Sequence, residues 1–122
     1  MCGIAGFYEP AWRRAQADLE QTARRMANTL RHRGPDDEGV WADARTGIAM
    51  GHRRLSILDL SMEGHQPMHS ADGRYVLAFN GEIYNVKDLR RELQSFGHDF
   101  RGHSDTEMML ASLCQWGLAG AL

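Results

Sequence analysis

Met1-Cys2-Gly3-Ile4-Ala5-Gly6-Phe7 places a thiol directly behind the first methionine. If Met1 is removed, Cys2 carries both a thiol and a free α-amino group. An α-amino group has a pKa of about 7.7–8.0, so it can accept a proton near neutral pH. Covalent catalysis requires such a base beside a nucleophile, and N-terminal residues are one way to build the pair. We therefore predict that Cys2 is a catalytic nucleophile. The alternative is an ordinary buried cysteine at the start of a strand.

Length and composition describe an ordinary globular chain. The 122 residues suffice for one domain, and the net charge of -2 does not call for nucleic acid or an anionic membrane as a partner. No apolar run approaches the roughly 18 residues of a membrane span, and the first residues lack the pattern of a secretory signal. Two cysteines, Cys2 and Cys114, form no disulfide framework. A reducing cytoplasm is therefore the expected location.

The hydrophobic pattern predicts strands and helices in alternation. Apolar spacing from Leu19 to Leu30 predicts a helix stopped by Gly34-Pro35, and Ser104 with Glu107 forms a capping box for a later helix ending at Gly117. A further helix is expected over 86–96, ended by Gly97. Strands are expected over 3–8, 40–41, 47–50, 74–80 and 82–84, with a strand end entering a loop at 54–60 and a long loop at 61–73. Tight turns such as Asn80-Gly81 favour antiparallel sheets with helices outside, an α+β fold.

Six short segments stand out as polar or glycine-rich: residues 2–6, 31–36, 51–59, 66–68, 80–85 and 104–107. Together they resemble the glutaminase domain of class II glutamine amidotransferases, the N-terminal-nucleophile type, in that family's order and spacing. The versions His-Arg-Gly-Pro-Asp at 32–36 and Arg-Leu-Ser-Ile-Leu-Asp at 54–59 are most similar to glutamine-hydrolysing asparagine synthetases. Each segment alone is a weak signal, but six in order are highly specific.

The resemblance implies a particular fold. Family members are αββα sandwiches of antiparallel sheets flanked by helices. Residues 1–122 are expected to form the N-terminal portion of such a glutaminase domain, truncated at the C-terminus. The apolar end at 118–122 fits a chain cut inside a fold. The synthetase domain that would use the ammonia is expected to be absent.

Asn80 and Gly81 are the expected oxyanion hole. Amide hydrolysis passes through a tetrahedral oxyanion that needs preorganised hydrogen-bond donors. Asn80 offers a side-chain amide, and Gly81 offers a backbone N–H without a Cβ to block approach. The resemblance assigns both residues this role. The alternative for an isolated match is a plain Asn-Gly hairpin turn.

Free glutamine carries an α-carboxylate and an α-ammonium group, so its site needs one fixed cation and one fixed anion. Arg54 suits the carboxylate because a guanidinium binds it through two parallel hydrogen bonds, and Asp105 suits the ammonium. The resemblance assigns these roles to both residues and adds backbone contacts near Leu58 and at Glu82. The alternatives are a surface arginine and a helix-capping aspartate.

The resemblance implies that Cys2 hydrolyses the side-chain amide of L-glutamine through a thioester. The ammonia would pass to a C-terminal synthetase domain of the same parent chain for ATP-dependent synthesis of asparagine or a related amide. No cofactor is expected here, ATP and Mg²⁺ are expected only in the absent domain, and a homodimer is left open. His65 and His69 are four residues apart, but their loop context does not favour a metal. Two alternatives remain: a silent fragment or interaction module, and an amidotransferase acting on a sugar acid.

Overall fold

The computed structural model describes residues 1–11, 13–56 and 61–122, which form two compact units. The first unit contains the described part of Met1–Leu58 together with His65–Pro67 and Ala78–Asn80. The second contains the described part of Asp59–Gly64 together with Met68–Leu77 and Gly81–Leu122. Each unit is α+β with antiparallel strands, which confirms the expected α+β class. None of the helices in the described ranges has the length and apolar character of a membrane span.

The first unit is built on a three-stranded antiparallel sheet in the order β1-β3-β2. Its strands are β1 (Gly3–Tyr8), β2 (Asp37–Asp43) and β3 (Ile48–Arg54). The predicted strands in these regions are confirmed, and β2 and β3 are longer than their apolar cores suggested. A turn joins β2 to β3, where Gly47 donates its N–H to the carbonyl oxygen of Asp43 at 2.8 Å. Gly47 has a φ of 76°, which favours glycine.

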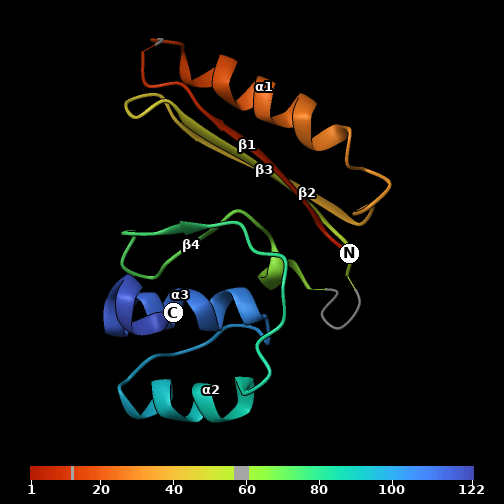
Figure 1. The fold of residues 1–122 in the computed structure, drawn as a ribbon. Coiled ribbons are helices and arrows are strands. Elements are labelled where there is room, and N and C mark those ends of the chain that lie inside the picture. Colours follow the sequence, from red (N-terminus) through yellow and green to blue (C-terminus); the bar gives the residue numbers. More distant parts are fainter. Residues whose placement is uncertain (12, 57–60) are drawn as a thin grey trace. The chain divides into compact units, whose positions relative to one another are not determined.

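The helix α1 (Gln16–Asn28) covers one face of this sheet (Figure 1). It buries Leu19, Ala23 and Ala27, three members of the predicted apolar stripe, and ends before the predicted stop at Gly34. Leu19 and Ala23 pack on Ala42 and Ala49 of the sheet. Because successive strand residues point to opposite faces, the β3 residues that alternate with Ala49, including His52 and Arg54, face away from α1.

In its described residues the second unit contains a short 3-10 helix, a two-stranded ribbon and two longer helices, α2 (Val86–Ser95) and α3 (Asp105–Ala121). α3 contacts both α2 and the strand β4 (Met68–His69) (Figure 1). The predicted helices are confirmed at their starts: Ser104 caps α3 by accepting a hydrogen bond from the Glu107 N–H at 3.2 Å. The predicted end of α3 at Gly117 is wrong: Gly117 departs from helical φ and ψ, but the helix continues to Ala121.

The strands predicted over 74–80 and 82–84 are largely wrong. Only β5 (Val76–Leu77) forms, paired with β4, and no described residue from 82 to 84 is in a strand. Asn80-Gly81 is therefore not a hairpin turn. The physical reason is that side chains replace strand partners: Phe79 donates its N–H to Gln66 at 2.6 Å and Ile83 donates its N–H to Asp105 at 2.7 Å. The loop predicted over 61–73 also holds β4 and the short 3-10 helix η1 (Met62–Gly64).

Candidate active site

Cys2 lies immediately before β1 and is half-buried. Its sulfur accepts a hydrogen bond from the Leu55 N–H at 3.4 Å, and its thiol lies 3.9 Å from the Leu55 carbonyl oxygen. Leu55 follows directly after the last residue of β3. The backbone at the end of β3 thus holds the thiol in place.

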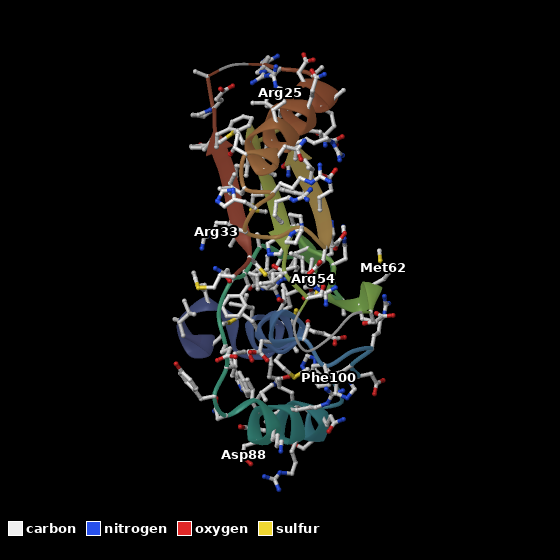
Figure 2. All side chains as sticks on the ribbon, turned by 90° about the vertical axis from the view of Figure 1, so that its right-hand side faces the viewer. Arg25, Arg33, Arg54, Met62, Asp88 and Phe100 are labelled. Carbon is white, nitrogen blue, oxygen red and sulfur yellow. The ribbon has the colours of Figure 1, made fainter. Side chains whose placement is uncertain are left out.

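Arg54 is the last residue of β3 and is buried, with 8% of its surface exposed (Figure 2). The register of β1 and β3 pairs Gly3 with Arg53 and Ile4 with His52. Continued by one residue, this register sets Cys2 opposite Arg54. Directly opposed residues of an antiparallel pair share a face of the sheet. The predicted nucleophile and the predicted carboxylate-binding arginine are therefore neighbours within the first unit.

Arg53 has a different task from its neighbour. Its Nε donates to the Gly34 carbonyl oxygen at 2.9 Å, and its Nη1 forms an ion pair with Glu38 at 2.5 Å. Adjacent strand residues point to opposite faces, so the side chain of Arg54 is directed away from this structural pair. The sequence pair Arg53-Arg54 thus separates into one arginine that fastens the loop before β2 and one on the face with Cys2.

His52 shares the Arg54 face of β3 and is 1% exposed. Within the described residues neither ring nitrogen has a partner in hydrogen-bonding geometry, although the Phe79 backbone is near enough to affect the ring. Burial lowers the pKa of His52, and Arg54 and His65 lower it further, while Phe79 and Asp37 oppose them. His52 is therefore neutral near pH 7, and Arg54 is the lasting positive charge on this face.

Asn80 is exposed and closes the segment 78–80, which belongs to the first unit with Cys2 and Arg54. The residue before it, Phe79, donates its N–H to the Gln66 side chain at 2.6 Å. Gln66 was singled out by its sequence motif but received no role there. The structure shows its contact: it holds the backbone next to Asn80.

The predicted site residues Gly81, Glu82 and Asp105 belong to the second unit. Gly81 and Glu82 are exposed, and Asp105 is the half-buried first residue of α3. Asp105 accepts the Ile83 N–H through Oδ2 at 2.7 Å, so it ties the segment that follows Gly81 to the start of α3. Leu58 lies outside the described residues.

The motif segment 31–36 contacts the backbone at the end of β3. Its last residue, Asp36, donates its N–H to the Arg54 carbonyl oxygen at 3.0 Å and accepts the Ser56 N–H at 2.7 Å. These bonds flank Leu55, the residue that contacts Cys2. The loop therefore braces the backbone that holds the thiol, a contact that the sequence pattern did not reveal. We assign it no proton transfer.

His65, one of the two histidines considered for a metal, lies with Nδ1 2.7 Å from Asp37 Oδ2. His69 belongs to the second unit. In the part of the chain that the structure describes, no three His, Cys, Asp or Glu side chains converge as metal ligands. His65 thus serves as a contact between its loop and β2.

Comparisons with known proteins identify the family of this chain. The family model of the glutamine amidotransferase domain matches residues 1–121. The chain belongs to this family. The expected resemblance is confirmed, and the chain is a glutamine amidotransferase domain that matches glutamine-hydrolysing asparagine synthetases.

The amidotransferase domain has relatives in distant organisms. Asparagine synthetase [glutamine-hydrolyzing] 3 of Bacillus subtilis is 41% identical over 119 residues, which are 95% of this chain and 18% of the relative. A putative asparagine synthetase [glutamine-hydrolyzing] of Mycobacterium tuberculosis is 41% identical over 128 residues, covering 96% and 20%. Amidase chry2 of Gibberella zeae is 35% identical over 126 residues, covering 98% and 19%. The amidotransferase domain thus spans about a fifth of the length of these curated relatives.

Proposed function

We propose that this domain hydrolyses the side-chain amide of L-glutamine through a thioester on Cys2. The observation that carries the proposal is the placement of Cys2 opposite Arg54, with the sulfur 3.4 Å from the Leu55 N–H. A nucleophile and a guanidinium on one face of a sheet can contact the two ends of a glutamine molecule, the side-chain amide and the α-carboxylate. Arg54 would bind the α-carboxylate, which leaves the side-chain amide to reach the thiol.

Asp105 would bind the α-ammonium group, with backbone contacts from Leu58 and Glu82. One oxygen of Asp105 orders the segment after Gly81 through Ile83. A carboxylate has lone pairs for several donors, so this bond is compatible with a substrate ammonium on the other oxygen.

The reaction would proceed in two steps. The Cys2 sulfur attacks the amide carbon of glutamine, and the α-amino group of Cys2 accepts the thiol proton and passes it to the leaving nitrogen. The C–N bond breaks, ammonia leaves and a γ-glutamyl thioester remains. Water then attacks the thioester, which releases glutamate and restores the thiol. Asn80 and Gly81 donate hydrogen bonds to the oxyanion in both steps.

The parent protein would use the ammonia. We propose that residues 1–122 are the N-terminal part of an αββα glutaminase domain, followed in the parent chain by a synthetase domain that makes asparagine with ATP. Asparagine synthesis rests on the printed names of the relatives that the chain matches over about a fifth of their length. Amidase chry2 shows that relatives of this domain also carry other names, so a different carboxylate acceptor is the second candidate.

The thioester can be observed directly. We expect methionine aminopeptidase to remove Met1, since residue 2 has a small side chain, and acid quenching during turnover to leave a γ-glutamyl group on the peptide that begins with Cys2. Intact-mass and peptide mass spectrometry of the native protein that contains this chain measure both. The peptide that contains Cys114 is the internal control. Glutamine turnover by protein that retains Met1 would contradict the role of the α-amino group.

Arg54→Lys should weaken glutamine use strongly. The single ammonium group of lysine cannot reproduce the two parallel hydrogen bonds of a guanidinium. The transition state should therefore lose about 1.5–3 kcal/mol of stabilisation, which lowers kcat/KM for glutamine roughly ten- to a hundredfold. Asp105→Asn should also raise the KM for glutamine. Steady-state titrations with glutamine and with ammonium salt in the parent protein separate substrate binding from folding.

Arg53→Lys is the matched control for Arg54→Lys. Arg53 is equally buried on the same strand, but it contacts Gly34 and Glu38 on the other side of β3. Arg53→Lys should therefore lower the stability of the fold with little effect on the KM for glutamine. If Arg54→Lys reduces the ammonia reaction as much as the glutamine reaction, Arg54 supports the fold and the pocket assignment is wrong.

A further inference from the structure

Gln66 supports the backbone that leads to the proposed oxyanion hole. Its side chain is buried, and its Oε1 accepts the Phe79 N–H at 2.6 Å. The strand β5 ends at Leu77, so Phe79 has no place in the ribbon of the second unit. A backbone N–H needs an acceptor, and here a side chain supplies it instead of a neighbouring strand. The contact fixes the residue directly before Asn80.

Gln66 is itself held against the sheet that carries the nucleophile. Its carbonyl oxygen lies so close to Gly39 of β2 that a Cβ at position 39 would overlap with it. The adjacent His65 contacts Asp37, also on β2, at 2.7 Å. Glycine at position 39 therefore permits a close approach of two backbones. These two contacts hold the segment of His65 and Gln66 against β2, the strand that pairs with β3.

We propose that Gln66 is a positioning residue for glutamine hydrolysis, which holds Asn80 at a fixed place relative to Cys2. The link runs from β2 through Gln66 and Phe79 to Asn80, all within the first unit. The inference rests on the proposed function, because it needs Asn80 to stabilise an oxyanion. Donors of an oxyanion hole must be aimed at the atom that becomes charged, and a displacement of about 1 Å can cost on the order of a hundredfold in rate.

If Gln66 positions Asn80, its substitution should change kcat for glutamine more than KM. Oxyanion donors act mainly in the transition state, so displacing them lowers kcat more than it raises KM. In the parent protein, Gln66→Met removes the acceptor at similar volume and should lower glutaminase kcat roughly ten- to a hundredfold. The KM for glutamine should change by less than about threefold. Gln66→Glu keeps an acceptor oxygen and should restore most of the rate.

Gln16→Met is the matched control. Gln16 also accepts a backbone N–H in the first unit, that of Ala44 at 3.0 Å, and donates to the Ala42 carbonyl oxygen at 2.8 Å. It is exposed on α1, on the side of the sheet away from Arg54. The loss of these two hydrogen bonds in Gln16→Met should affect stability without lowering kcat for glutamine. Rates are normalised to the amount of folded protein, measured by gel filtration and circular dichroism, so poorly folded molecules do not enter the comparison.

A double-mutant cycle with Asn80→Ala decides whether Gln66 acts through Asn80. If it does, Gln66→Met should cost less than about threefold in kcat in the Asn80→Ala background, because coupled residues are not additive. Equal losses in both backgrounds, or an unchanged kcat in Gln66→Met, would overturn the inference. If Gln66→Met does not fold, the same cycle is run with Gln66→Glu, whose smaller loss must likewise vanish beside Asn80→Ala. An Asn80→Ala variant with full activity refutes the proposed oxyanion hole instead.

Discussion

Cys2→Ala should abolish glutamine-dependent activity of the parent protein while ammonia-dependent synthesis continues. The reason is that the thiol forms the thioester and nothing else in the proposed sequence of steps, so added ammonia bypasses it. Its contact with the Leu55 backbone lies at the end of β3, outside the core cluster that Leu19, Ala23, Ala42 and Ala49 form among the described residues. The substitution should therefore leave the fold intact. Glutamate release and amide synthesis from ammonium salt, assayed on the same preparation, measure the two activities.

Cys114→Ala is the control for this result. Cys114 lies on α3, where burial raises the pKa of its thiol and the carboxyl group of Asp72 beside it adds to the shift. A thiol with a raised pKa is a poor nucleophile at neutral pH. Glutaminase turnover should be nearly unchanged apart from stability. Similar losses from the two substitutions would argue against Cys2 as the nucleophile.

Asn80→Ala should lower kcat for glutamine by roughly a hundred- to a thousandfold, the effect of removing one oxyanion-hole donor. The side chain is exposed and ends a segment held by Gln66 and Phe79, so its removal creates no cavity. The KM for glutamine should change little, since the amide donor acts on the charge that develops in the transition state. Steady-state titration with glutamine measures both constants.

Asn28→Ala provides the comparison for Asn80→Ala. Asn28 is also exposed, at the last residue of α1, and it lies in the same unit. It should leave kcat and KM unchanged. A loss in kcat for Asn80→Ala below about threefold would remove Asn80 from the oxyanion hole.

The elements that the sequence predicted well depend on local interactions. The apolar spacing of α1 involves residues three and four apart, and the cap of α3 joins Ser104 to Glu107 within one turn. The strand predicted over 74–80 failed for a different reason. Its β-branched and aromatic residues favour a strand, but Gln66, thirteen residues earlier, takes the N–H of Phe79. No pattern within the segment reveals that competing partner.

The sequence by itself determined the family, the α+β class and the residues proposed for the chemistry. The reason is that six short motifs occur in the family's order, and each motif is recognised from a few consecutive residues. Only the tertiary structure decided which contacts hold those residues. It set Cys2 opposite Arg54, directed Arg53 to Glu38, and joined Gln66 to Phe79. These pairs are separated by 13 to 52 residues, since Cys2 and Arg54 differ by 52 in number and Gln66 and Phe79 by 13. Strand register and backbone hydrogen bonding create such neighbours, and neither is encoded in any single stretch of the chain.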